Sequence, residues 1–87
     1  MKSQITYDFR ACFMRLPPRI QERARKSYRL WKQDHAHPSL QFKAIHAHHG
    51  IYSVRISRNY RALGLVQKDI ITWFWIGTHA EYDRLIK

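Results

Sequence analysis

The most regular hydrophobic pattern along the chain lies between Pro18 and Asp34. Apolar side chains recur there at helical spacing and form one stripe, while arginine and lysine side chains occupy the rest of the circumference. Pro18 suits the first turn of a helix, because its missing N–H would have no partner there. The pattern predicts a helix over residues 18–34, with an apolar stripe of Ile20, Ala24, Tyr28 and Trp31.

Three strand-like runs follow in the second half of the chain, at Gly50–Ser57, Tyr60–Val66 and Ile70–Ile76. The segments between them, Arg58-Asn59 and Gln67–Asp69, are short enough to be hairpin turns. The runs therefore predict consecutive antiparallel strands. Because strand side chains alternate between faces, Trp73 and Trp75 are expected on one face of the last strand and Phe74 on the other.

Weaker signals predict the remaining elements. Ile5 and Tyr7 alternate and could form a short first strand, and Leu40–Ile45 could add another strand. The segment Ala80–Ile86 is expected to form a short terminal helix, with Thr78 or His79 near its N-cap.

Together these elements indicate an α+β fold in which an N-terminal helix packs on an antiparallel meander and a short helix ends the chain. We expect one domain over residues 1–87. No segment approaches the roughly 18 uninterrupted apolar residues that a membrane helix needs, and the start of the chain lacks the apolar core of a signal peptide. A cytoplasmic protein with no membrane partner is therefore expected.

The charge balance narrows the range of partners. Lysine and arginine total 16 against six acidic residues, which gives a formal net charge of +10. Such a charge on a small body costs stability through self-repulsion, and polyanions would relieve it. The single cysteine, Cys12, excludes an internal disulfide framework and a four-cysteine zinc site, and it points to a reducing compartment.

Three arginines lie close together around the central hairpin, at Arg55, Arg58 and Arg61. If the neighbours of Arg55 in its strand face the core, Arg55 faces the opposite way. In a meander, Arg55 and Arg61 can then share one exposed face and grip a phosphate with two guanidinium groups. The alternative is a solvated strand face without a ligand.

His79 is the histidine placed at a strand-to-helix junction. An imidazole titrates near neutrality, as a general acid or base must, and Tyr82 would share its helical face. The alternative makes His79 a capping residue and Tyr82 part of the core. Two short loops hold the other histidines, and paired histidines can bind zinc or copper. Apart from Asp34, no Cys, Asp or Glu lies near them at a repeated ligand spacing, so solvated loop histidines are expected and no metal site is predicted. These histidines are His35, His37, His46, His48 and His49.

The order of these segments resembles the RelE/ParE superfamily of toxins from type II toxin–antitoxin systems. The matching segments are Leu16-Pro17-Pro18, Ile20–Ala24, Tyr28, Trp31, Pro38–Lys43, Tyr52–Ile56, Tyr60–Gly64 and Trp73–Asp83. The resemblance implies helices packed on a twisted antiparallel sheet whose concave face is the active surface. It also implies a cognate antitoxin that neutralises that surface.

Site residues follow from the resemblance position by position. Arg61 matches the arginine that contacts the scissile phosphate in RelE-like nucleases, and Arg55 matches a basic residue of the same site. His79 falls where these nucleases have a functional arginine or histidine, and Tyr82 approximates their C-terminal tyrosine. Two departures stand out: Ser53 replaces a lysine of RelE, and Tyr82 lies closer to the last strand than the tyrosine of RelE does.

The resemblance thus implies a toxin that cleaves mRNA on the ribosome and needs no cofactor or metal. Arg55 and Arg61 would neutralise the phosphate, and His79 would transfer a proton. Further RNA contacts are expected from four basic residues, Arg58, Lys43, Arg23 and Lys26. The superfamily also contains gyrase poisons, so a non-enzymatic toxin that binds a protein target stays an alternative, as does a basic RNA-binding module without toxicity.

Overall fold

The structure, a computed structural model, describes residues 1–46 and 48–86. Over these ranges it contains three α-helices, one 3-10 helix and five strands. The helices are α1 (Tyr7–Met14), α2 (Pro18–Gln33) and α3 (His79–Leu85), and the 3-10 helix is η1 (Pro38–Leu40). The strands are β1 (Lys2–Ile5), β2 (Lys43–Ala44), β3 (Ile51–Ser57), β4 (Tyr60–Gln67) and β5 (Ile70–Thr78). None of the helices in the described residues has the length and hydropathy of a membrane span.

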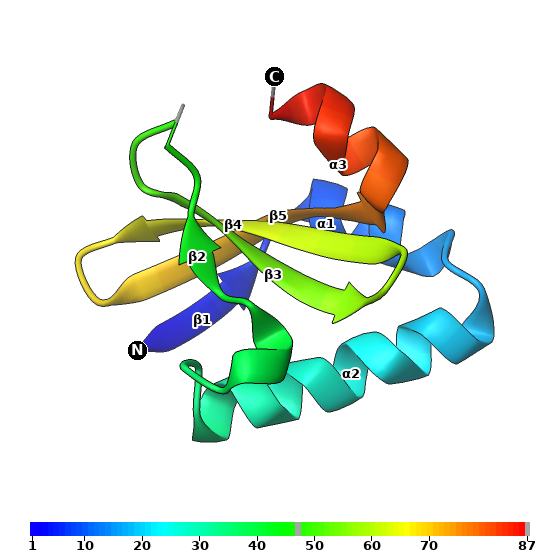
Figure 1. Cartoon of the computed structure of the whole chain (residues 1–87), viewed down its shortest axis with the longest axis horizontal. Helices are drawn as coiled ribbons and strands as arrows, with labels where there is room; N and C mark the ends of the chain where they lie inside the picture. The colour runs from blue at the N-terminus through cyan, green and yellow to red at the C-terminus, as the bar shows by residue number, and fades with distance from the viewer. Residues whose placement is uncertain (47, 87) are drawn as a thin grey trace.

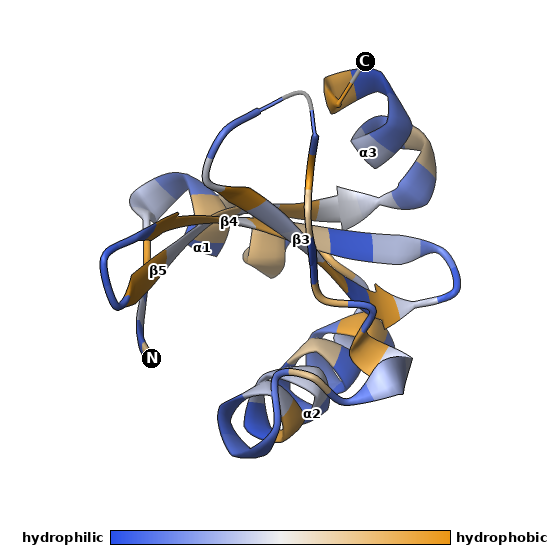
Figure 2. Ribbon diagram, turned by 60° about the vertical axis from the view of Figure 1, so that its left-hand side comes forward, coloured by the Kyte–Doolittle hydropathy of each residue, from blue (hydrophilic) through white to orange (hydrophobic). Residues whose placement is uncertain are grey.

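The strands form one sheet in the order β1-β5-β4-β3-β2. Figures 1 and 2 show α2 and α3 on opposite sides of this sheet. The α+β class, the β3–β4–β5 meander and the terminal helix are confirmed. The sheet is mixed rather than purely antiparallel, because β1 pairs in parallel with β5 at the edge. Helices α1 and α2 separate β1 from the meander in the sequence, so no hairpin forces β1 to run antiparallel.

Two segments, one at the start of α1 and one after α2, differ from the sequence-based expectation. Tyr7 is the first residue of α1 instead of a strand residue, since the side chain of Thr6 caps that helix by accepting from the amide of Phe9 at 3.0 Å. In the predicted strand 40–45, only two residues pair with β3, and Leu40 closes the 3-10 turn that follows α2.

A β-bulge in β5 overturns the expected placement of the tryptophans. Trp73 lies opposite Gly64 whereas Trp75 lies opposite Leu63, so Phe74 is the extra residue in β5. Neighbouring residues of β4 point to opposite faces. Trp73 and Trp75 therefore lie on different faces, and the simple alternation fails because the bulge changes the register.

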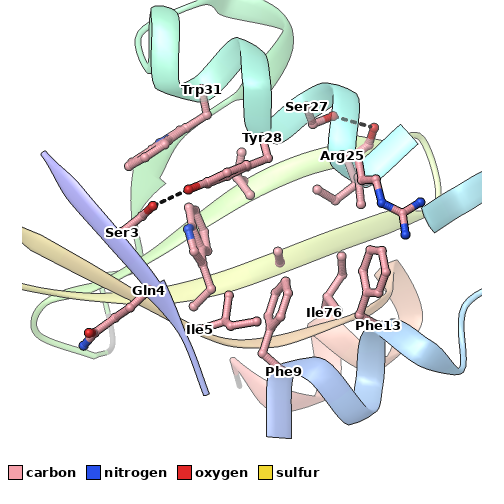
Figure 3. Close-up of a pocket in the computed structure, with 15 residues that line it drawn as sticks. Ser3, Gln4, Ile5, Phe9, Phe13, Arg25, Ser27, Tyr28, Trp31 and Ile76 are labelled. Carbon is pink, nitrogen blue, oxygen red and sulfur yellow. Dashed lines mark hydrogen bonds between the residues drawn. The ribbon is translucent and has the colours of Figure 1, made fainter. Parts of the chain in front are cut away.

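Helices α1 and α2 leave an apolar groove open on their side of the sheet (Figure 3). The groove has a volume of about 390 Å³ and runs between β1, α1, α2 and the central strands. Ile5 and Tyr28, which line it, are 47% and 39% exposed. The cations of Arg25 and Lys32 lie over the rings of Phe13 and Tyr28, at 5.1 and 5.6 Å from the ring centroids.

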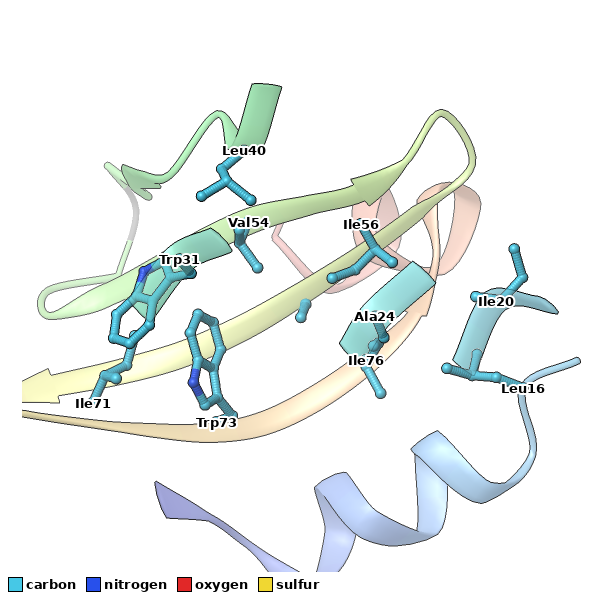
Figure 4. Close-up of a cluster of buried hydrophobic side chains, with 11 residues drawn as sticks. Leu16, Ile20, Ala24, Trp31, Leu40, Val54, Ile56, Ile71, Trp73 and Ile76 are labelled. Atoms are coloured by element: carbon cyan, nitrogen blue, oxygen red, sulfur yellow. The ribbon is translucent and has the colours of Figure 1, made fainter. Parts of the chain in front are cut away.

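The hydrophobic core continues from this groove across the same face of the sheet (Figure 4). Trp31 from α2 packs edge-on against Trp73 from β5, with ring centroids 5.5 Å apart. Both indole N–H groups are buried and have no hydrogen-bond partner among the described residues. The core comprises Leu16, Ile20, Ala24, Trp31, Leu40, Val54, Ile56, Ala62, Ile71, Trp73 and Ile76.

Candidate phosphate-binding and catalytic site

The hairpin of β3 and β4 brings two arginines directly opposite each other, Arg55 and Arg61. The next pair along the hairpin, Val54 and Ala62, is buried in the core on the α2 side. Alternation therefore directs both arginines to the face that carries α3. Like charges placed opposite each other across two strands destabilise a sheet. An anion bound between the two guanidinium groups would remove this cost.

Arg61 is held in place by the turn that follows β3. Its Nη1 donates to the carbonyl oxygen of Ser57 at 2.7 Å and to that of Tyr60 at 3.0 Å. Partial burial, and then the positive charge of Arg55, lower the pKa of Arg61. The guanidinium nevertheless keeps its charge at neutral pH and retains N–H groups beyond those two bonds. The arrangement presents a fixed, partly desolvated cation.

The last strand carries His79 to the same site. Gly77 lies opposite Arg61, and α3 begins two residues later at His79. The backbone N–H of His79 donates to the carbonyl oxygen of Asn59 at 2.7 Å, which ties α3 to the β3–β4 turn. Nδ1 of His79 lies 3.5 Å from Oδ2 of Asp83, and the imidazole is 43% exposed. Nε2 is therefore the ring nitrogen left for an incoming substrate.

Tyr82 joins His79 to the arginines. Its ring stacks on the imidazole with centroids 5.7 Å apart, and the residue is 7% exposed. Together with Asp83, Tyr82 raises the pKa of Arg61 and so opposes the effects of burial and of Arg55. Tyr82 is therefore buried, as expected for a core residue, and it also borders the charged site.

A capping box fixes the start of α3 beneath these side chains. The side chain of Thr78 accepts from the backbone N–H of Glu81, and the carboxylate of Glu81 accepts from the backbone N–H of Thr78 at 3.1 Å. The hydroxyl of Thr78 also donates to this carboxylate at 2.9 Å, and the two hydrogen bonds that the carboxylate accepts from Thr78 lower the pKa of Glu81. Gly77 is required nearby, since a Cβ there would lie 2.5 Å from the ring of Trp75.

The four basic residues expected to contact RNA fall into three places. Lys43 in β2 lies opposite Ser53, which in turn lies opposite Leu63 on the Arg61 side, so Lys43 shares the face of the arginine pair. Ser53 is 2% exposed, and Lys43 is its neighbour across the β2–β3 pair. Arg58 is exposed in the β3–β4 turn.

Arg23 and Lys26, in contrast, line a second recess on α2. This recess, which we call the basic cleft, has a volume of about 410 Å³ and lies between α2, η1 and the end of β3. Arg55 lines it as well. The cleft is lined by Arg23, Lys26, Ser27, Leu30, Ser39, Leu40, Arg55, Ile56 and Ser57.

The sequence pattern did not single out Asp83, whose carboxylate lies 3.5 Å from Nδ1 of His79. The (i, i+4) spacing of His79 and Asp83 on a predicted helix was the available signal. The basic cleft and the apolar groove had no such signal, because both depend on how α2 sits on the sheet. Within residues 1–46 and 48–86, no three His, Cys, Asp or Glu side chains form a group that could hold a metal ion.

Comparison with solved structures identifies the class of fold. RelE in the RelB–RelE antitoxin–toxin complex from Methanococcus jannaschii superposes with a TM-score of 0.77 at 18% identity, covering 97% of this chain and 99% of that chain. The YoeB/ParE toxin from Agrobacterium tumefaciens gives 0.69 at 17% identity, covering 91% and 99%. The isolated RelE toxin from E. coli gives 0.64 at 13% identity, covering 99% and 98%. The chain thus has the fold of RelE-type toxins.

The sequence itself matches the family model of the ParE-like toxin domain over residues 18–84. The chain belongs to this family, and thereby to the RelE/ParE superfamily of toxins from type II toxin–antitoxin systems. No curated protein matches the sequence significantly.

Proposed function

We propose that this protein is a toxin that inhibits translation by cleaving mRNA on the ribosome. One observation carries the proposal: two directly opposed arginines lie on the face where α3 presents an imidazole with Nδ1 3.5 Å from a carboxylate. A surface that served only solubility would gain nothing from placing like charges opposite each other in a hairpin. A site that stabilises a phosphorane and moves a proton needs both features.

The chemistry needs no group beyond these side chains. The 2′-hydroxyl of RNA attacks the adjacent phosphorus, and the bond from phosphorus to the 5′-oxygen breaks. Arg55 and Arg61 neutralise the charge that develops on the phosphorane oxygens, from positions set before the substrate arrives. Nε2 of His79 takes the proton of the attacking 2′-hydroxyl and then gives it to the departing 5′-oxygen, while Asp83 holds the ring and stabilises its charged form. Tyr82 borders the same space.

Action on the ribosome would explain why so few catalytic groups suffice. The ribosome can hold mRNA in the in-line geometry that the attack requires, and such positioning can account for much of a rate enhancement. The net charge of +10 favours association with ribosomal RNA as well as with mRNA. Action on translating ribosomes would take place in the cytoplasm.

The apolar groove supports a second part of the proposal, a protein antitoxin as partner. Exposed apolar surface bounded by polar residues marks protein interaction sites. The RelE chains from M. jannaschii and from Pyrococcus horikoshii OT3 are described in complex with RelB. An antitoxin segment with apolar side chains for the groove and carboxylates for Arg25 and Lys32 would complement this face.

The proposal is tested by inducing the wild-type protein, Arg61→Gln and the surface control Arg29→Gln in the same cells. We expect wild type and Arg29→Gln to stop incorporation of labelled amino acid and to generate new mRNA ends, and Arg61→Gln to do neither. Arg61→Lys keeps the charge but loses the planar fork, so it should recover part of the activity. Inhibition by wild type without new mRNA ends would refute the nuclease proposal.

The match to the ParE-like family model favours one alternative, a non-enzymatic toxin that binds a protein target such as DNA gyrase. Incorporation of labelled thymidine separates the two functions. A gyrase-type toxin would stop DNA synthesis before protein synthesis, whereas the proposed nuclease stops protein synthesis first.

A further inference from the structure

The basic cleft joins residues that are far apart in the sequence. Arg23 and Lys26 lie one helical turn apart on α2, and Ser27 anchors the helix by donating to the carbonyl oxygen of Ile56 at 3.5 Å. A register shift in β3 between Arg55 and Ser57 adds a residue and increases the local twist. Arg55 stands at this bulge, where it faces Arg61 across the hairpin and also lines the cleft.

The lining of the cleft matches the chemistry of a phosphate group. Three basic residues and the three serines Ser27, Ser39 and Ser57 are among the residues that line it, and no acidic residue of the described chain lines it. Within residues 1–46 and 48–86, neither Arg23, Lys26 nor Arg55 has a carboxylate within 4.0 Å. Concentrated positive charge without internal compensation is what a bound polyanion stabilises. A recess of about 410 Å³ is also large enough for a nucleotide-sized group.

We propose that the basic cleft binds the phosphodiester next to the one held between Arg55 and Arg61. Arg55 then bridges two successive phosphates of a single RNA strand. The strand leaves the arginine pair over the end of β3, which β2 does not pair, and passes onto α2, away from α3. The proposal rests on the proposed function for the identity of the strand, and it adds a binding site and a direction that the function does not require.

Salt dependence of RNA binding tests the cleft. For single-stranded nucleic acid, each bound phosphate contributes about 0.7 to the slope of log affinity against log salt concentration. We expect the double variant Arg23→Gln/Lys26→Gln to reduce the slope by about 0.7 for each phosphate that is no longer neutralised, measured by anisotropy with a short labelled single-stranded RNA. The matched control is Arg29→Gln/Lys32→Gln, which removes one arginine and one lysine from α2 outside the cleft. Equal slopes for the two double variants would overturn the proposal.

Two further measurements identify the ligand and separate this proposal from the function. In NMR spectra, the RNA should shift the amide signals of Ser39 and Ser57, and inorganic phosphate at equal concentration should not. Equal shifts by both would identify a free anion as the ligand and overturn the RNA path. Loss of toxicity in Arg61→Gln with no special effect of the cleft variant would reject the cleft alone. If the cleft variant reduces the salt-dependence slope but the wild-type protein cleaves no mRNA, the proposed function alone is rejected.

Discussion

The two faces of the sheet carry opposite kinds of surface although the same strands build them. In β4, Arg61 faces the α3 side and its neighbour Ala62 faces the core beneath α2. The α2 side combines buried aromatic rings with an open apolar groove, whereas the α3 side combines opposed cations with a single short helix. Stability and partner binding are therefore expected to depend on one face and chemistry on the other. Substitutions can separate these roles cleanly.

The largest expected effect is on the α3 face. His79→Ala should reduce the rate of mRNA cleavage by roughly 10²–10⁴-fold, because the proton-transfer group is lost. Affinity for ribosomes should hardly change, since it is spread over many basic side chains. Cleavage in a purified translation system measures the rate, and sedimentation with ribosomes measures affinity. Asp83→Asn should show a smaller loss, and a fully active His79→Ala would contradict the assignment.

On the α2 face, the largest effect should be on folding. Trp73→Ala removes a ring that is 5% exposed and packs against Trp31, and it should lower the free energy of unfolding by about 3–5 kcal/mol. Trp75→Ala should cost less, because Trp75 is half-buried on the other face. Urea denaturation of both variants measures the difference. Equal losses would contradict the separation of the two tryptophans by the bulge.

A substitution in the apolar groove should weaken neutralisation by the antitoxin without changing the toxicity of the free protein. Ile5→Asp places a negative charge where we expect an acidic partner, and disruption of a buried interface position of this kind costs about 2 kcal/mol, which is about 30-fold in affinity. Coexpression with the antitoxin would then fail to rescue growth, while the uninhibited toxin would act as before. Ile70→Asp is the matched control, since Ile70 is 39% exposed and lies outside the groove. Equal loss of rescue in both variants would remove the groove from the interface.

The smallest effect should come from the N-cap of α3, at the end of β5. Thr78→Ala should lower stability by about 1 kcal/mol at neutral pH. Hydrogen bonds from Thr78 lower the folded-state pKa of Glu81 below its usual 4.5, so their stabilisation is present above that pH and is lost as the pH falls through the folded-state value. In Thr78→Ala the backbone N–H still donates to the Glu81 carboxylate and only the hydroxyl bond to it is lost, whereas the cap bond from the Glu81 amide does not titrate. Thermal melts from neutral to acid pH should therefore show the gap between wild type and Thr78→Ala becoming smaller without closing. A gap that stays constant into acid would show that Glu81 does not take part.

Sequence patterns predicted most of the elements that have regular periodicity. The stripe from Ile20 to Trp31 identified α2, and the two short turns identified the hairpins, because these signals are local. The parallel pairing of β1 and the bulge at Phe74 depend on contacts between distant segments, so alternation alone gave the wrong result for Trp73 and Trp75.

The candidate site, too, could be predicted from the sequence only where its contacts are local. Alternation placed Arg55 and Arg61 together, because the register of a tight hairpin follows from its turn. The sequence could not predict that Arg55 lines the same cleft as Arg23 and Lys26. This arrangement depends on how α2 packs against the bulged end of β3. Sequence reasoning treated the charges of α2 as one basic surface, whereas the structure places some in a cleft and others at the rim of a groove.

The pairing of β1 with β5 also bears on when the protein becomes active. Lys2 lies opposite Ile70, and Ile5 lies opposite Trp73. The first strand to be synthesised, β1, therefore cannot pair until β5 has been synthesised. Contacts of such long sequence separation fold slowly, because the intervening loop must close first. His79 emerges later still. The proposed catalytic face therefore cannot assemble in a nascent chain until β5 and α3 have been synthesised.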